Sequence, residues 1–161
     1  MEITQDLAIL ADYEQSGAVR QVPWEGTLHL VPWFILRKPE PSGEKLRLIA
    51  DCRTLNRWFS PKTFRLDHLQ SILPFLRKGQ WAGKIDLKDA YFHLSLGEKL
   101  CPYIRMAVGD SCWEFKGGCF GPNVLPQKFM SVMTVLEKVW RAQGILIFVH
   151  LDDLLNLGET L

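Results

Sequence analysis

The strongest hydrophobic pattern in the chain lies in its second half, where apolar residues recur every three or four positions between residues 125 and 140. Such spacing gathers the apolar side chains on one face of a helix. Asn123 is suited to cap the helix N-terminus, and Gly144 is typical of the position that follows a helix end. The apolar positions of this predicted helix are Leu125, Phe129, Val132, Met133, Leu136, Val139 and Trp140.

Short apolar runs on both sides of that helix predict β-strands. They cover residues 81–87, 101–108, 112–116, 145–150 and 154–157. Gly109-Asp-Ser111 separates the second run from the third, and Asp152-Asp153 separates the last two runs. Each of these two pairs of runs is therefore predicted to form a hairpin.

The first half of the chain has a weaker pattern. A helix is predicted from Ile3 to Gln15, and residues 27–36 and 45–52 read as the two strands of a further hairpin. Residues 66–76 have helical spacing, which Pro74 is expected to end early. This order of elements indicates an α+β domain in which helices pack on one face of a largely antiparallel sheet.

Composition excludes several classes of protein. The chain has 161 residues, of which 47% are hydrophobic and 23% charged, as in an ordinary globular domain. No apolar run approaches the roughly 20 residues that cross a bilayer, and no basic-then-apolar leader opens the sequence. The four cysteines lack Cys-x-x-Cys spacing. We therefore expect an intracellular protein (cytoplasm or nucleus) without membrane association, and free thiols in preference to a zinc site.

The net charge of +1 hides a basic block at residues 37–84, which holds eleven basic and four acidic residues. The rest of the chain is acidic and includes two close carboxylate sets, Asp86 with Asp89 and Asp152 with Asp153. A basic block beside clustered carboxylates suits a polyanion that is handled with a divalent metal. A solvated, salt-bridged surface explains the charge pattern equally well.

Asp86 and the Asp152–Asp153 pair each follow an apolar strand. Taken alone, each is explained by helix capping or by the frequency of Asp in turns. If the two strands are neighbours in one sheet, Asp86 and Asp152 project from the same edge, where a divalent cation relieves their repulsion. Mg²⁺ held by two carboxylates and substrate phosphates is the arrangement of two-metal polymerases and nucleases.

Four ordered segments resemble the motifs of reverse transcriptases, especially those of retroelements such as the DIRS-type retrotransposons. Residues 46–56 (LRLIADCRTLN) are similar to the fingers motif and residues 86–94 (DLKDAYFHL) to motif A. Residues 120–129 (FGPNVLPQKF) are similar to motif B and residues 148–154 (FVHLDDL) to motif C. The resemblance implies part of a right-hand RNA-directed DNA polymerase, with a palm of antiparallel sheet and helices, a fingers hairpin, and no thumb.

The resemblance also implies a fingers-like region with the N-terminal helix at residues 1–85 and a palm-like region at residues 86–161, cut short after motif C. The thumb and any RNase H domain would belong to a longer parent chain. RNA or DNA template-primer and a deoxynucleoside triphosphate are the implied partners, with Mg²⁺ or Mn²⁺ as cofactor. Asp51, Arg53 and Asn56 are expected to stabilise the fingers rather than to contact substrate.

Roles for particular residues follow from the same resemblance. Asp86, Asp152 and Asp153 would be the catalytic carboxylates and hold the metal ions. Tyr91 would be the steric gate against a ribose 2′-hydroxyl, with a core aromatic as the plain alternative. His150 would lie near the primer terminus, in place of the usual Tyr.

Further residues would bind the incoming nucleotide. Asp89 and Ala90 would offer backbone N–H groups to its triphosphate. Lys38 and Arg47 would close over the phosphates from opposite strands of the fingers hairpin, and Arg37 could replace Lys38. The implied set is Lys38, Arg47, Asp89, Ala90, Tyr91 and Gly121.

Three functional hypotheses remain open at this stage. The first is the catalytic part of a reverse transcriptase that transfers nucleotides to a primer 3′-hydroxyl. The second is an inactive retroelement-derived remnant that binds nucleic acid, which the His150, Cys119 and Pro122 departures from the motifs favour. The third is a structural interaction domain, because a shortened palm leaves sheet edge and apolar surface for a partner.

Overall fold

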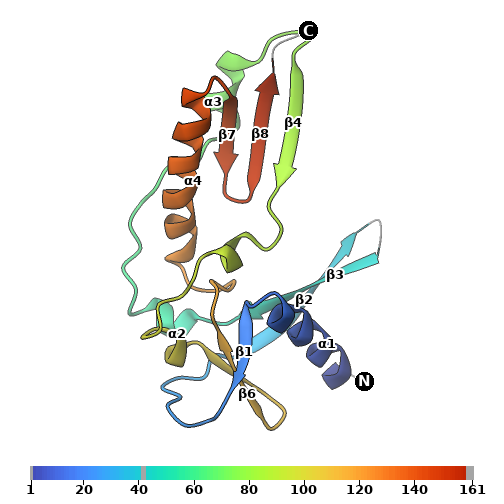
Figure 1. The fold of residues 1–161 in the computed structure, drawn as a ribbon, viewed down its shortest axis with the longest axis vertical. Coiled ribbons are helices and arrows are strands. Elements are labelled where there is room, and N and C mark those ends of the chain that lie inside the picture. The colour runs from blue at the N-terminus through green and yellow to red at the C-terminus, as the bar shows by residue number, and fades with distance from the viewer. Residues whose placement is uncertain (1, 41–42, 159–161) are drawn as a thin grey trace. The chain divides into compact units, whose positions relative to one another are not determined.

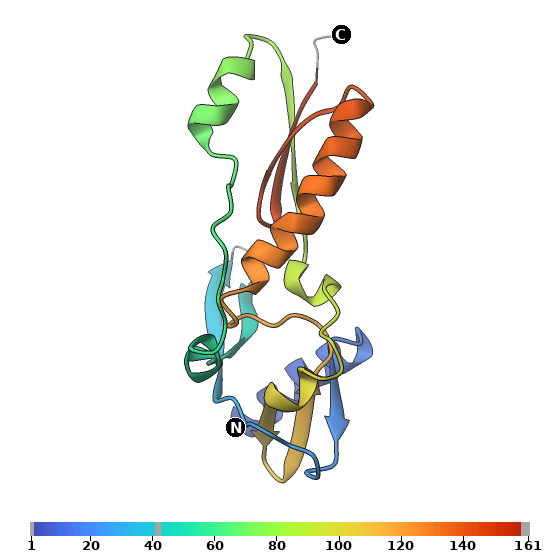
Figure 2. The same cartoon turned by 90° about the vertical axis from the view of Figure 1, so that its left-hand side faces the viewer.

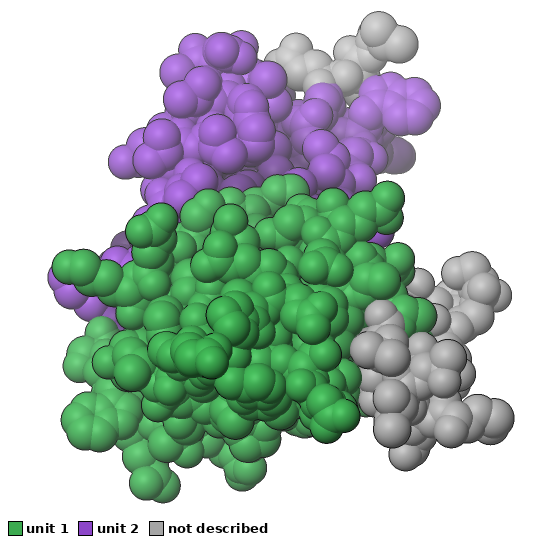
Figure 3. Space-filling view, turned by 60° about the horizontal axis from the view of Figure 1, so that its bottom comes forward, with its two compact units in different colours: residues 1–60, 91–122 green, residues 61–90, 123–161 purple. Residues whose placement is uncertain are grey.

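The computed structural model describes residues 2–40 and 43–158. The chain divides into two compact units, each built from two separate stretches of sequence (Figure 3). Unit 1 comprises residues 1–60 and 91–122, and unit 2 comprises residues 61–90 and 123–161. The chain therefore crosses between the units after residues 60, 90 and 122.

Unit 1 contains a small antiparallel sheet, a hairpin and a helix at the start of the chain. Its elements are α1 (Glu2–Gln15), β1 (Val19–Val22), β2 (Trp33–Glu40), β3 (Gly43–Ala50), α2 (Arg53–Asn56), η3 (Cys101–Tyr103), β5 (Arg105–Val108) and β6 (Ser111–Phe115). The sheet has the order β1-β6-β5, and β2 pairs with β3 as a separate hairpin (Figure 1). The predicted N-terminal helix and both predicted hairpins of this unit are confirmed, but the strand predicted at residues 27–36 lies instead at Trp33–Glu40.

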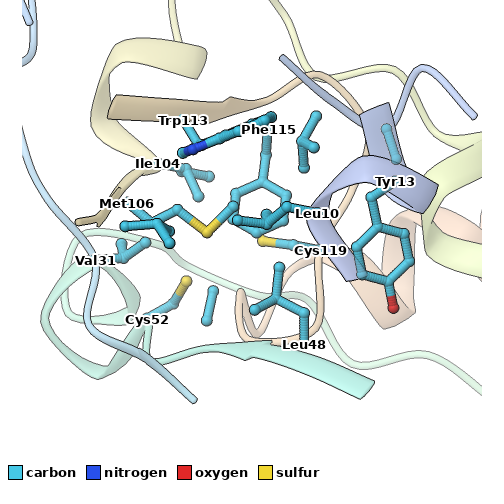
Figure 4. Close-up of a cluster of buried hydrophobic side chains, with 14 of the residues drawn as sticks. Leu10, Tyr13, Val31, Leu48, Cys52, Ile104, Met106, Trp113, Phe115 and Cys119 are labelled. Atoms are coloured by element: carbon cyan, nitrogen blue, oxygen red, sulfur yellow. The ribbon is translucent and has the colours of Figure 1, made fainter. Parts of the chain in front are cut away.

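An apolar cluster with residues from α1, β1, β3, α2, β5 and β6 forms the core of unit 1 (Figure 4). Leu10 of α1, Leu48 of β3 and Phe115 of β6 are each at most 1% exposed. β6 is the middle strand of its sheet, and its last four residues are all buried, so both of its faces are covered. Because β6 has no solvent-facing side, a charged residue on it must find its partners inside the unit.

Glu114 of β6 is that charged residue, and it is 1% exposed. Arg20 of β1 and Arg105 of β5 lie directly opposite it across the sheet. Arg105 Nε donates to Glu114 Oε2 at 2.8 Å, and Arg20 Nη2 donates to Oε1 at 2.6 Å. Burial acts to raise the pKa of Glu114, but the hydrogen bonds and charges of the two arginines outweigh it and lower the pKa.

Unit 2 consists of a three-stranded antiparallel sheet and the long helix. Its elements are α3 (Leu69–Ile72), η1 (Leu73–Phe75), β4 (Trp81–Asp86), α4 (Leu125–Ala142), β7 (Leu146–His150) and β8 (Asp153–Gly158), and η2 (Ala90–His93) spans the boundary with unit 1. The strand order is β4-β8-β7, and α4 packs beside β7 (Figures 1 and 2). The predicted hairpin around Asp152–Asp153 is confirmed.

The mixed α/β class with antiparallel pairing is confirmed, but the single sheet expected from the sequence is wrong. The described strands form three separate small sheets, two of them in unit 1 and one in unit 2. Two predicted elements are also shorter than expected. Residues 66–76 yield only α3 and η1, in which Pro74 lies, and the run at 101–108 becomes a strand only from Arg105, after a 3₁₀ turn that contains Pro102.

The long helix α4 is confirmed, but two details predicted for it are wrong. Its N-cap residue is Val124 rather than Asn123, with Pro126 in the first turn. The apolar positions also do not form one buried face. Leu125, Phe129 and Met133 are buried, whereas three of the seven predicted positions, Val132, Leu136 and Val139, face solvent. Val135, which lies outside the predicted set, also faces solvent, and the exposed fractions of these four residues are 39–60%.

No helix in the described part of the chain is long and apolar enough to cross a membrane. Cys52, Cys101, Cys112 and Cys119 are buried free thiols. The division into a fingers-like region at 1–85 and a palm-like region at 86–161 concerns parts of a polymerase, and it stays a prediction, as does an intracellular location.

Candidate functional site

Three of the predicted site residues lie in one row across the sheet of unit 2. Asp86, the last residue of β4, is the cross-strand partner of Asp153, and His150, the last residue of β7, is the partner of Asp153 on its other side. Residues directly opposite in an antiparallel pair project from the same face, with Cα atoms about 4.5–5.5 Å apart. The strand adjacency on which the carboxylate hypothesis depended is therefore present.

Asp152 occupies the tip of the β7–β8 hairpin, in a loop of two residues. Its carbonyl oxygen accepts a hydrogen bond from the Leu87 N–H at 2.9 Å, so the residue after β4 is tied to this tip. The other loop residue, Leu151, has φ +56°, a left-handed conformation that costs a non-glycine residue about 1–2 kcal/mol. Strained turns of this kind are frequent at functional sites.

Lys84 is the nearest cation to this carboxylate cluster. It precedes Asp86 by two residues and so shares its face of β4, and its Nζ lies 2.8 Å from Asp153 Oδ1. The hydrogen bond and charge of Asp153 raise the pKa of Lys84, and the charges of Asp86 and Asp152 add to the effect. One ammonium group therefore neutralises part of the charge of all three carboxylates.

The donor set at this tip fits a magnesium ion only in part. Carboxylate oxygens on adjacent strands are the hard ligands that Mg²⁺ prefers, and Mg²⁺ is often bound by one or two carboxylates together with substrate phosphates. Within residues 2–40 and 43–158, no three His, Cys, Asp or Glu side chains gather closely enough to hold a metal ion. Asp86 and Asp153 could thus supply two ligands, while phosphates and water would have to supply the others.

His150 is fixed from the far side of the sheet by Asp67. Its Nδ1 lies 2.6 Å from the Asp67 carbonyl oxygen, which requires the proton on Nδ1. The Asp67 carboxylate in turn accepts from the Val149 N–H at 3.1 Å. Arg141 lies 3.8 Å from that carboxylate and 2.7 Å from Glu137, so α4 contributes to the support. Burial raises the pKa of Glu137. The charge of Arg141 lowers this pKa, whereas the charge and hydrogen bond of Asp67 raise it further.

Unit 1 brings together residues from three of the four motifs. The Arg47 guanidinium lies over the Phe120 ring, 4.7 Å from its centroid. The Tyr91 ring packs edge-on against the same Phe120 ring, with 5.2 Å between the two ring centroids. Phe120 therefore links the fingers strand β3 to the tyrosine of motif A.

Gly121 follows Phe120 at the point where this loop meets the end of β3. The Ala50 N–H donates to the Phe120 carbonyl oxygen at 2.9 Å, and Asn56 Nδ2 donates to the Gly121 carbonyl oxygen at 3.0 Å. Gly121 has φ +150°, and a Cβ there would lie 2.1 Å from the Ala50 carbonyl oxygen. Only glycine fits this close approach of two backbones.

The register of the β2–β3 hairpin distinguishes Lys38 from Arg37. Arg47 is opposite Leu36, and Lys38 follows Leu36 by two residues, so Lys38 shares the face of Arg47 whereas Arg37 points to the other face. Lys38 is exposed and available to an anion on that face.

The expected fingers-stabilising residues contact one another and the chain nearby. Arg53 Nη2 lies 2.6 Å from Asp51 Oδ2, and this ion pair with its hydrogen bonds lowers the pKa of Asp51. Asn56 bonds Gly121, as described above. These contacts agree with a supporting role for all three residues.

Asp89 and Ala90 lie where unit 2 passes into unit 1. Asp89 has φ +50°, a left-handed conformation that Asp tolerates better than most residues, and Ala90 is 4% exposed at the start of η2. The predicted tight turn is present here. Unit 2 thus gathers Asp86, Asp152, Asp153 and His150, and unit 1 gathers Arg47, Tyr91 and Gly121.

Three residues with evident parts in these arrangements were missed by sequence reasoning. Phe120 lies inside motif B, but no sequence signal pairs it with Arg47. Lys84 could have been found, because a position two residues before Asp86 must share its face. Asp67 lies 82 residues from Val149 along the chain, and only the fold brings them together.

Comparison with known proteins gives several distant relatives, while no family model matches the chain. It is similar to the genome polyprotein of Petunia vein clearing virus (isolate Shepherd), with 24% identity over 129 residues. It is also similar to the retrovirus-related Pol polyprotein from transposon 412 of Drosophila melanogaster, with 25% identity over 138 residues, and to the Gag-Pol polyprotein of Bovine immunodeficiency virus (strain R29), with 24% identity over 159 residues.

These matches cover most of the chain but little of each relative. They span 80%, 84% and 91% of this chain and 6%, 11% and 10% of the three polyproteins. The chain therefore corresponds to a short part of much longer proteins. The similarities support a retroelement-derived protein.

Proposed function

We propose that this chain is the fingers and palm part of an RNA-directed DNA polymerase, which adds deoxynucleotides to a primer 3′-hydroxyl on an RNA or DNA template. The observation that carries the proposal is the pairing of β4 with β8, which sets Asp86 opposite Asp153 beside the Asp152 turn. Similarity to Pol polyproteins over 80% or more of the chain is independent support.

The chemistry proposed for the carboxylate tip is metal-assisted nucleotidyl transfer. Bound Mg²⁺ or Mn²⁺ would supply Lewis acidity, which favours loss of the primer hydroxyl proton and stabilises charge on the leaving pyrophosphate. Asp86 and Asp152 would hold the metal ions, with Asp153 completing the acidic cluster. His150, fixed by the Asp67 carbonyl oxygen, would bound the primer side of the tip.

The residues gathered in unit 1 are proposed to bind the incoming nucleotide. Arg47 presents a planar donor fork suited to phosphate oxygens, and Lys38 on the same face presents a point charge. Tyr91 would exclude a ribose 2′-hydroxyl, because its ring is held against Phe120 and cannot swing aside without losing that contact. The turn at Asp89 and Ala90 would offer N–H groups to the triphosphate.

An inactive nucleic-acid-binding remnant is the second candidate, and one observation favours it. Lys84 already pairs with Asp153, and the described residues hold no cluster of three metal ligands. A remnant of this kind would retain the basic surface without binding metal. Nucleotide-dependent metal binding therefore separates the two candidates.

The test measures Mn²⁺ and Mg²⁺ binding by the full chain in the presence of a deoxynucleoside triphosphate. The native protein is compared with Asp86→Asn and Asp152→Asn, and Asp110→Asn is the matched control, because Asp110 is an exposed carboxylate in a hairpin turn of unit 1. A circular dichroism melt of each sample verifies that it is folded.

We expect nucleotide-dependent metal binding in the native chain and in Asp110→Asn, and its loss in both site variants. Binding that is absent from a folded native chain, or equal in all four proteins, would overturn the polymerase proposal and leave the remnant. The assay is preferable to primer extension because it needs none of the surface that a thumb would contribute.

A further inference from the structure

Unit 1 contains a pocket of about 530 Å³ to which none of the roles proposed above is assigned. Its walls come from the chain after β1, from the end of α2 and from η3, and they include Leu28, His29, Trp58, Phe59 and Tyr103. The volume lies within the 300–1,000 Å³ that is usual for small-ligand sites. Leu28 N–H and His29 N–H both donate to the Pro102 carbonyl oxygen, at 3.0 and 3.2 Å, so two of the walls are joined by hydrogen bonds.

The aromatic side chains of this pocket are unusually open to solvent. Trp58 is 84% exposed and Tyr103 is 42% exposed, while Leu55 beneath them is buried. A large indole left in water at the rim of a pocket loses the hydrophobic stabilisation that burial would bring. A planar ligand that stacks on Trp58 and Tyr103 would recover that stabilisation.

The pocket lining also includes polar residues, among them Thr54 and His29. His29 Nε2 is buried and makes no hydrogen bond to any residue that the structure describes. Buried polar atoms nearly always have a partner, so each exception needs an explanation. A ligand whose planar ring has hydrogen-bond donors and acceptors at its edge would supply a partner for His29 Nε2.

The charged residues next to the pocket along the chain favour an anionic chain as ligand. The stretches at residues 26–30, 53–60 and 98–104 contribute Arg57 and Lys99 against Glu98, while Arg53 is already paired with Asp51. Arg57, Lys99 and Glu98 are exposed. Aromatic rings beside basic side chains are the usual composition of a single-strand binding surface.

We propose that this pocket binds an unpaired nucleobase of a single-stranded nucleic acid, stacked on Trp58 and Tyr103, with the adjacent phosphates held by Arg57 and Lys99. The identity of that strand as the template rests on the proposed function. A nucleobase fits better than an apolar peptide side chain, because it meets both the orphan His29 nitrogen and the excess of basic residues.

The test is fluorescence anisotropy of a short labelled single-stranded RNA and of an abasic oligonucleotide of the same length, which has the same phosphates and no bases. Both are measured in chelator and without nucleotide. The variants are Trp58→Ala, Tyr103→Ala and Trp58→Phe. Trp81→Ala is the matched control, because Trp81 is 68% exposed on unit 2 and lines none of the pocket.

We expect Trp58→Ala to weaken binding of the base-carrying strand about tenfold, within the range measured for loss of one stacked base. Tyr103→Ala should weaken it severalfold, Trp58→Phe should restore most of the affinity, and Trp81→Ala should change nothing. Binding of the abasic strand should be equal in all of these proteins.

Three outcomes would overturn the inference. The first is that Trp58→Ala binds the RNA as tightly as the native chain does. The second is that Trp58→Ala weakens binding of the abasic strand as much as binding of the RNA. The third is that N-acetyl-tryptophanamide displaces the RNA while free nucleosides do not. The last would identify the pocket as a peptide site. Because the assay contains chelator, failure of the metal site leaves the measured RNA affinity unchanged.

Discussion

At the residue scale, the tightest constraint in unit 1 is the absence of a side chain at Gly121. The Phe120–Gly121 backbone lies directly on the end of β3, and three separate elements depend on that contact. Arg47 reaches Phe120, Asn56 reaches Gly121, and Tyr91 meets the same phenyl ring. A displaced loop would therefore disturb Arg47 and Tyr91, two of the unit 1 residues assigned to nucleotide binding.

Gly121→Ala should lower the free energy of unfolding by at least about 2 kcal/mol, since the new Cβ meets the Ala50 carbonyl oxygen and φ is unfavourable. Urea denaturation measures the loss. Gly97→Ala is the control, because an added Cβ there has nothing within 4 Å. Equal loss in both variants would contradict the steric explanation.

Lys84 gives a second residue-scale prediction. Its ammonium partly neutralises the carboxylate tip, so Lys84→Gln should tighten Mn²⁺ binding about two- to fivefold, as expected for removal of one exposed ion pair. Lys84→Arg keeps the charge and should bind Mn²⁺ as the native chain does. Lys138→Gln removes an equal charge from the exposed side of α4 and should have no effect. Unchanged affinity in Lys84→Gln would remove Lys84 from the site.

At the element scale, α4 is one helix with two apolar stripes that have different surroundings. Leu125, Phe129 and Met133 pack in unit 2, whereas the stripe that contains Val135 has no cover among the described residues. The periodicity of the sequence is the same for both stripes, since hydrophobic spacing reports the helix and not its neighbours. Nothing in the structure identifies what would cover the exposed stripe.

Met133→Ala should therefore destabilise the protein by about 2–5 kcal/mol, because it leaves a cavity against the sheet. Val135→Ser, on the exposed stripe of the same helix, should change the unfolding free energy by no more than about 0.5 kcal/mol. Thermal or urea unfolding of both variants measures the difference. A large loss in Val135→Ser would mean that the stripe is covered in solution, for example by a second copy of the chain.

At the scale of the whole molecule, the chain leaves and re-enters each unit, so neither core is built from one continuous stretch. In unit 1, β1 pairs with β6 although Arg20 and Glu114 are 94 residues apart in the chain, and the buried Glu114 joins β1, β5 and β6 through Arg20 and Arg105. Loss of one member would leave a buried charge without its partner, which is more costly than loss of an exposed pair.

Glu114→Gln should cost about 3–5 kcal/mol of unfolding free energy near neutral pH. The pKa of Glu114 is lowered in the fold, so its contribution is complete above the ordinary value of 4.5 and is lost as the pH falls through the lowered value. The native and variant stabilities should therefore converge in acid. Glu14→Gln, on the exposed side of α1, is the control and should match the native protein at every pH. If the difference in stability between the native protein and Glu114→Gln stayed constant down to acid pH, the ionic explanation would be refuted.

The sequence by itself determined the elements that depend on local periodicity. The N-terminal helix, α4, the three hairpins and the two strand ends at Asp86 and Asp152–Asp153 follow from spacing, turn residues and glycine positions, because each is decided within a dozen or so neighbouring residues. The motif order also placed the carboxylates on strands that prove to be neighbours.

Only the tertiary structure decided how these elements pair and which surfaces stay open. The division into three sheets, the register that sets Asp86 against Asp153, the Lys84 and Asp67 contacts and the exposure of Trp58 all depend on residues far apart in the chain. Strand register and burial are set by packing against distant partners, and hydrophobic spacing contains no information on which partner is chosen.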